Sequence, residues 1–169
     1  MDETTLSLRF PLRACWMKVG QQKQIKAFVS PNRSYHLIGA QDWLTDQVFT
    51  LKVERKNSQT FIQFLEYLLV QCFPDEKVIL VLDNASYHKS KATLAALSLF
   101  EPRVRVVWLP KYSPDLNPIE RFWRHLKDLA AANKMDQSLE NLAHRVDEII
   151  DCQNSENHSL KISFSKNFV

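Results

Sequence analysis

The feature that most constrains the fold of this chain is a run of five consecutive apolar residues, Val78–Leu82, that ends at an aspartate. The run is too short for a helix and lacks polar alternation, so it predicts a central strand covered on both faces. The next segment, Lys89–Phe100, has helical composition, and Val104–Leu109 is again rich in β-branched residues. Because a strand, a helix and a strand in succession place the two strands parallel, the pattern predicts an α/β fold with a mixed sheet.

Hydrophobic periodicity predicts the remaining elements. Runs of β-forming residues on either side of a polar segment indicate an antiparallel hairpin, and apolar residues three and four positions apart indicate helices. An asparagine followed by a proline is typical of a helix start, because proline is tolerated at the first helical position. The predicted elements are hairpin strands at 34–41 and 47–53, a helix around 61–69 behind the capping candidates Asn57 and Ser58, a helix that begins at Asn117 and Pro118, and a last helix at about 136–151.

Length and composition limit the class of protein. A chain of 169 residues with 45% hydrophobic content suits one continuous domain with its own core. No stretch reaches the roughly 18 apolar residues of a membrane span, and the N-terminus lacks the features of a signal peptide, which predicts a cytoplasmic protein without a membrane partner. The cysteines include no Cys-x-x-Cys pair, which argues against a zinc site. The net charge of +3 permits a nucleic-acid partner.

Two carboxylates stand where chemistry is expected. Asp83 lies at the C-terminal end of the predicted buried strand, the edge of a sheet at which ligands usually bind, or else it only caps the following turn with the help of Asn84. Glu120 lies in the first turn of a predicted helix, where the helix dipole favours a carboxylate, or else it forms a surface ion pair with Arg124. Three prolines between Trp108 and Glu120 stiffen the connection, which suits a preorganised site.

The segments VLDNASYHKSK and WLPKYSPDLNPIERFWRHLK, which contain these two carboxylates, resemble the second and third catalytic blocks of DDE transposases of the mariner-like bacterial insertion-sequence superfamily. In that family the second carboxylate ends a strand and the third opens a later helix, and here Glu120 follows Asp83 by 37 positions. The Asp2-Glu3 pair is similar to the family's first block, in which an aspartate ends the opening strand. The resemblance runs from Asp2 to about Lys127.

The resemblance implies an RNase H-like α/β fold with a mixed central sheet flanked by helices. It implies a catalytic domain at residues 1–152 whose first strand is truncated before Asp2, and a polar C-terminal tail at 153–169. The helix-turn-helix DNA-binding domain that the family carries upstream is expected to be missing from this chain. Asp2, Asp83 and Glu120 would be the catalytic metal ligands. They suit Mg²⁺ or Mn²⁺, two ions in number, because hard cations take oxygen ligands.

Two further residues belong to the resembling blocks as supporting residues. His88 follows Asp83 by five positions and would touch the scissile phosphate or a metal-bound water; alternatively it only forms a hydrogen bond with the backbone at a helix start. Asn84 would orient Asp83, or else only cap the turn.

The implied activity is metal-dependent cleavage and strand transfer at the ends of an insertion sequence. The implied partners are end DNA, target DNA and a second copy of the chain or more, because two ends must be paired. The implied location is the bacterial cytoplasm, with association to the nucleoid on DNA. Basic side chains near the site would contact phosphates without reading sequence, although each alone also fits a solvated helix face. They are Lys89, Lys91, Lys111, Arg121, Arg124 and Lys127.

Two other functions stay open at this point. The chain is alternatively a truncated, catalytically inactive fragment that binds DNA or a transposase, because Asp2 at a frayed terminus would not be held within the tolerance of metal ligation. It is otherwise a metal-dependent nuclease or resolvase of the same fold, since a fold does not determine a function.

Overall fold

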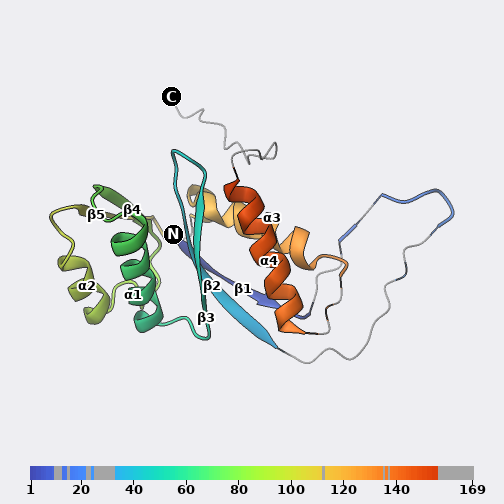
Figure 1. The fold of residues 1–169 in the computed structure, drawn as a ribbon, viewed down its shortest axis with the longest axis horizontal. Helices are drawn as coiled ribbons and strands as arrows, with labels where there is room; N and C mark the ends of the chain where they lie inside the picture. The colour runs from blue at the N-terminus through green and yellow to red at the C-terminus, as the bar shows by residue number, and fades with distance from the viewer. Residues whose placement is uncertain are drawn as a thin grey trace.

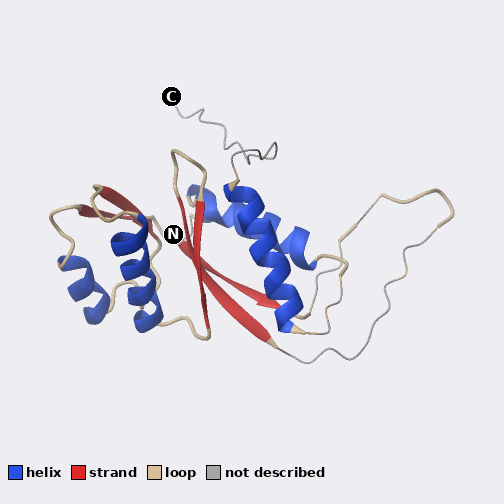
Figure 2. Cartoon of the chain, viewed as in Figure 1, coloured by secondary structure: helices blue, strands red, loops and turns tan. Residues whose placement is uncertain are grey.

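The computed structural model describes residues 1–9, 13–14, 16–21, 24, 33–111, 113–134, 136 and 138–155. In these residues, helices lie on both sides of a central group of strands (Figure 1, Figure 2). The strands are β1 (Asp2–Ser7), β2 (Ser34–Gln41), β3 (Val48–Val53), β4 (Val78–Leu82) and β5 (Val104–Trp108). The helices are α1 (Ser58–Glu66), the π-helical turn η1 (Tyr67–Cys72), α2 (Lys91–Ser98), the short 3-10 helix η2 (Pro114–Leu116), α3 (Pro118–Ala131) and α4 (Leu139–Asn154).

The strands form one antiparallel and one parallel ladder, which together confirm the α/β class. The predicted hairpin is confirmed as β2 and β3, and β1 pairs antiparallel with β2, with Asp2 opposite Gly39. β4 and β5 run parallel, as predicted from the strand, helix and strand pattern. The two ladders meet where the backbone nitrogen of Met1 donates a hydrogen bond to the carbonyl oxygen of Val81 at 2.9 Å. The start of β1 therefore lies beside β4.

β2 separates two hydrophobic cores, because successive side chains of a strand point to opposite faces. Tyr35 and Leu37 pack into the core formed with α3 and α4. Ile38 and Ala40 pack into the core formed with α1, η1 and β4. The alternation in β2 thus fixes which helices lie on which side of the sheet, and Figure 1 shows α1 and α3 on opposite sides of β2.

One expectation about β4 is wrong. Leu80 and Leu82 are buried, but the side chain of Ile79 is 67% exposed, so the strand is covered on one face only. The apolar residues of α1 and α2 cover the face that carries Leu80 and Leu82. On the other face Ile79 lines an open cavity of about 580 Å³, together with Met1 and Leu116. A run of apolar residues does not distinguish a strand buried on both faces from one that lines a cavity on one face, since both carry the same kinds of residue.

The predicted helices form with small shifts at their ends. The side chain of Asn57 accepts a hydrogen bond from the backbone nitrogen of Thr60 at 3.0 Å, so Asn57 rather than Ser58 caps α1. The last helix runs to Asn154 and is capped by Ser138, so it begins and ends about three residues later than expected. Positions 153–154 of the predicted tail are therefore helical, and 156–169 lie outside the described residues. No helix in the described part of the chain is both long and apolar enough to span a bilayer.

Asn117 and Pro118 start α3 as predicted, but the asparagine has a different partner. Its side chain makes no capping hydrogen bond within the helix, and its Nδ2 instead donates to the carbonyl oxygen of Met1 at 3.2 Å. The asparagine is buried, so this bond gives its amide a partner inside the protein. The start of α3 is thereby attached to the start of β1.

Gly39 is required by the close approach of α3 to β2. A Cβ atom at this position would lie 2.6 Å from Cη2 and 2.7 Å from Cζ2 of the buried Trp123 side chain. We expect Gly39→Ala to lower the free energy of unfolding by about 1–3 kcal/mol, as overpacked cores do. Urea denaturation would measure the loss. The same change should cost less in a Trp123→Phe background, because a smaller ring leaves room for the methyl group. An equal cost in both backgrounds would contradict the steric explanation.

Candidate active site

The three carboxylates predicted to be catalytic come from three different elements. Asp2 is the first residue of β1, Asp83 directly follows β4, and Glu120 lies in the first turn of α3. The expectation that Asp2 stands at the end of its strand, with only Met1 before it, is wrong in one respect: a paired strand begins at Asp2. Thr4 and Leu6 are buried on one face of that strand, which keeps it in the sheet. Asp2 is therefore held by strand pairing.

The electrostatics of Asp2 indicate that these carboxylates are close together. Burial, assisted by the charges of Glu3, Glu120 and Asp83 and opposed by a hydrogen bond from the backbone of Glu3, raises the pKa of Asp2 to about 6. Burial and nearby like charges both disfavour the ionised form of a carboxylate, so the ionised Asp2 is destabilised at this place. Such a place favours a cation.

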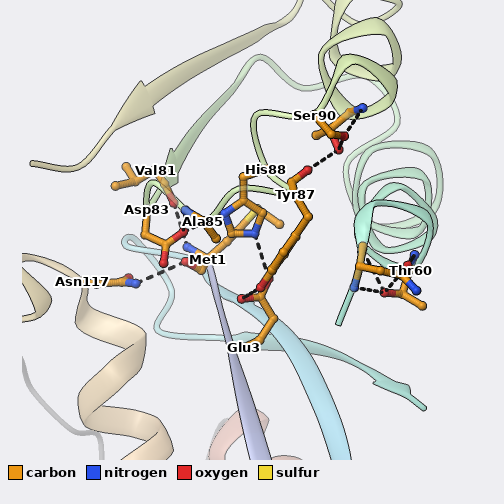
Figure 3. Close-up of polar contacts among 12 residues, drawn as sticks. Met1, Glu3, Thr60, Val81, Asp83, Ala85, Tyr87, His88, Ser90 and Asn117 are labelled. Carbon is orange, nitrogen blue, oxygen red and sulfur yellow. Dashed lines mark hydrogen bonds and ion pairs between the residues drawn. The ribbon is translucent and has the colours of Figure 1, made fainter. Parts of the chain in front are cut away.

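A buried histidine connects Asp83 to a carboxylate that sequence reasoning did not single out. His88 is fully buried, its Nδ1 lies 2.7 Å from Oδ1 of Asp83, and its Nε2 lies 2.9 Å from Oε1 of Glu3. The hydroxyl of Tyr87 donates to the other oxygen of Glu3 at 2.6 Å. Figure 3 shows these side chains in one group beside Met1. Ionised carboxylates only accept hydrogen bonds, so both nitrogens of His88 donate.

The charge of His88 follows from this geometry. Burial lowers the pKa of its imidazole, but the hydrogen bonds and negative charges of Glu3 and Asp83 raise the pKa to above its ordinary value overall. The imidazolium thus lies between two carboxylates and offsets part of their charge. The alternative in which His88 only forms a hydrogen bond with the backbone does not describe its ring, whose nitrogens contact two carboxylates. Its contact with the scissile phosphate or a metal-bound water stays a prediction.

The turn after β4 brings the histidine back to Asp83. The backbone nitrogen of Ala85 donates to Oδ1 of Asp83 at 2.9 Å, and the backbone nitrogen of His88 donates to the carbonyl oxygen of Ala85 at 3.0 Å. The ring of Phe61 on α1 packs against the imidazole with centroids 4.2 Å apart. The capping role and the functional position predicted for Asp83 are therefore compatible, because one oxygen serves the turn.

Asn84 and Lys89 connect the ends of two strands. The side-chain nitrogen of Asn84 donates to the carbonyl oxygen of Leu109, just after β5, and its side-chain oxygen accepts from Lys89. The ammonium group of Lys89 also lies 4.7 Å from the centre of the Trp108 ring. Asn84 thus holds the end of β4 against the end of β5, and among the described residues its side chain forms no hydrogen bond with Asp83.

The basic residues predicted near the site separate into two groups. Lys127 is half-buried, and burial and the charge of Lys56 lower the pKa of its ammonium group, against the effects of Asp2 and Glu120. It is therefore close to the carboxylates, and Lys56, which the sequence analysis missed, lies near Lys127. No ion pair in the described part of the chain joins Glu120 to Arg124. The others are exposed: Lys89, Lys91, Lys111, Arg121 and Arg124.

The carboxylates fit hard divalent cations by their chemistry. Oxygen ligands are what Mg²⁺ and Mn²⁺ prefer, and the raised pKa of Asp2 shows charge that a cation would compensate. Within the described residues, however, no three acidic, histidine or cysteine side chains already stand together at the distances of a metal site.

The comparisons with known proteins assign a family. The DDE superfamily endonuclease family matches residues 1–143, and the chain belongs to that family. An insertion element IS630 uncharacterized 39 kDa protein of Shigella sonnei is 33% identical over 147 residues, which are 86% of this chain and 42% of that protein. The chain therefore spans less than half the length of this curated relative.

Solved structures show the same fold. A Mos1 transposase paired-end complex with the left transposon end matches with a TM-score of 0.68 and 22% identity, over 89% of this chain and 46% of that one. The catalytic domain of Mos1 mariner transposase matches with a TM-score of 0.57 and 21% identity, over 77% of this chain and 67% of that one. The fold is the RNase H-like fold, as the resemblance implied.

The charge of Asp2 should limit stability when no metal is present. Its folded-state pKa of about 6 lies above the ordinary value of 3.8, so the folded state binds this proton more tightly than the unfolded state. The stability that this difference contributes is present at pH 4 and is lost as the pH rises through 6. We therefore expect Asp2→Asn to raise the melting temperature at pH 8 in the presence of a chelator and to change it little at pH 4.

Scanning calorimetry at both pH values would measure this effect. Asp75→Asn is a suitable control, because Asp75 is an exposed carboxylate in the connection between η1 and β4. A lower melting temperature of Asp2→Asn at pH 8 would contradict the crowding of negative charge.

Proposed function

We propose that this chain is the catalytic domain of an insertion-sequence transposase that cuts DNA at the ends of the element and joins it to target DNA. The observation that carries the proposal is that hydrogen bonds of Met1, the residue before Asp2, join it to β4 just before Asp83 and to the start of α3 just before Glu120, in a chain of the DDE superfamily endonuclease family. Acidic side chains that different elements bring together at the edge of a sheet suit metal-dependent phosphoryl transfer.

The proposed cofactor is Mg²⁺ or Mn²⁺, as two ions held by Asp2, Asp83 and Glu120. Mos1 paired-end complexes with Mn and with Mg support this choice. Bound ions of this kind would activate the attacking water or 3′-hydroxyl and stabilise the leaving oxygen. The ions and their number are proposals for this chain.

The chain's own residues would hold and orient the ligands. Oδ1 of Asp83 is fixed by His88 and by the backbone of Ala85, while the side chain is 44% exposed and its Oδ2 has no hydrogen bond within the described part of the chain. One oxygen thus anchors the carboxylate and the other is available. Lys127 balances part of the charge of Asp2 and Glu120.

DNA is the proposed substrate, bound by the exposed basic side chains and by Lys127. Contacts from lysine and arginine to phosphates position DNA and give no sequence information. The Mos1 matches include a paired-end complex and a strand transfer complex, which supports pairing of two ends by two or more copies of this chain. Which bases are recognised depends on residues other than these.

Loss of either carboxylate should abolish cleavage. A supercoiled plasmid that carries the ends of the insertion sequence should be nicked by the protein in Mn²⁺, and its 3′-hydroxyl ends should be joined to other DNA. Asp83→Asn and Glu120→Gln should reduce nicking to the level without protein, because each removes a charged ligand while it keeps the size of the side chain. Glu101→Gln, at an exposed carboxylate after α2, should nick normally. Equal nicking by Asp83→Asn would contradict the proposal, and nicking without joining would indicate a nuclease.

A calorimetric titration separates metal binding from catalysis. Mn²⁺ should bind the unmodified chain and should not bind a variant with both Asp83→Ala and Glu120→Ala, since the double change removes two of three proposed ligands. Binding that is no stronger than in this variant would favour the alternative function, a catalytically inactive fragment that binds DNA or another transposase.

A further inference from the structure

We propose that Glu3 is a positioning residue that holds the carboxylate of Asp83 in its working orientation through His88. The inference rests on the proposed function in one respect, because Asp83 is taken as a metal ligand. The role of Glu3 itself follows from the contacts of the described residues.

The three side chains form a line from the interior to the surface. Glu3 is almost fully buried, with 5% of its side chain exposed, His88 is 0% exposed, and Asp83 is 44% exposed. The two contacts of the imidazole are 2.9 Å and 2.7 Å long, which are distances of charge-assisted hydrogen bonds. An imidazole with both nitrogens bound has no freedom to turn. The donor that faces Asp83 is therefore fixed by the acceptor on the opposite side of the ring.

The position of Glu3 is in turn fixed by the sheet and by Tyr87. Glu3 stands opposite Ile38 in the ladder of β1 and β2, and its second oxygen accepts the hydrogen bond from Tyr87. The Tyr87 ring lies 4.6 Å from the imidazole, and Phe61 packs on the imidazole as well. Through His88, Glu3 thus links β1 of the antiparallel ladder to Asp83 at the end of β4 in the parallel ladder.

A purely structural role explains this arrangement less well. A buried ion pair often contributes little to stability, because desolvation of both charges offsets their attraction. A role in orienting a metal ligand explains why a buried ion pair is present despite the desolvation of its charges, since loss of such hydrogen-bond partners typically weakens metal binding about 10- to 100-fold.

A double-mutant cycle tests the connection. Glu3→Gln removes the charge that holds Nε2 of the imidazole. His88→Asn keeps a donor near the position of Nδ1 and removes the connection to Glu3. Each change should weaken Mn²⁺ binding about 10- to 100-fold by calorimetry. The double variant should bind no more weakly than the weaker single variant, because both changes break the same path. Effects that multiply would show two independent roles and overturn the proposal.

Two controls separate positioning from folding and from the proposed function. Glu101→Gln makes the same change of side chain at an exposed carboxylate after α2 and should keep Mn²⁺ affinity within about twofold, a change small beside the 10- to 100-fold loss. If Glu3→Gln lowers only the melting temperature and its folded form binds Mn²⁺ like the unmodified chain, the proposal is wrong. If Glu3→Gln does not fold, Glu3→Asp, which keeps the charge but is one methylene shorter, is measured in its place with the same expected loss. If Asp83→Asn itself binds Mn²⁺ normally, the metal site rather than the role of Glu3 is refuted.

Discussion

The backbone of Met1 holds together the elements that carry the candidate active site. Its nitrogen donates to the carbonyl oxygen of Val81 on β4, and its carbonyl oxygen accepts from the side chain of Asn117 at the start of α3. Each of these three positions lies within three residues of one carboxylate, Asp2, Asp83 or Glu120. Two hydrogen bonds on one residue therefore gather three acidic side chains that are far apart in sequence. The surrounding cores support this junction from both faces of β2.

The same junction creates an electrostatic conflict. Negative side chains from β1, α3 and the end of β4 are brought near one another, and burial together with their charges raises the pKa of Asp2. The chain reduces the conflict with two cations of different kinds. His88 compensates the charge from inside the protein, and Lys127 does so from the side of α3. Among the described residues, Asp2 forms no ion pair with a basic side chain.

Local sequence patterns predicted the elements and two of the carboxylates, because strands, turns and helix starts have short-range causes. The hairpin of β2 and β3, the parallel pair of β4 and β5, and the start of α3 at Pro118 all follow from such patterns. The partner of His88 did not, because Glu3 lies 85 positions away and only the fold brings it near. The Asp2-Glu3 pair resembled the first block of the family and so pointed to Glu3 as well. The sequence does not show, however, that Glu3 contacts His88. The burial of β4 on one face only was not predicted, because the residue types of a strand do not show which elements cover each of its faces.

The absence of a side chain at Gly39 has a consequence for chemistry. Gly39 stands opposite Asp2 in the sheet, and the ring that lies against it belongs to Trp123, one turn after Glu120 on the same helix. The absence of a side chain at Gly39 lets α3 pack closely on β2. The distance between α3 and β2 in turn affects how far Glu120 on α3 lies from Asp2. A glycine at this position therefore affects the packing of α3 and also the separation of the carboxylates of Asp2 and Glu120, although it has no side chain to contact either one.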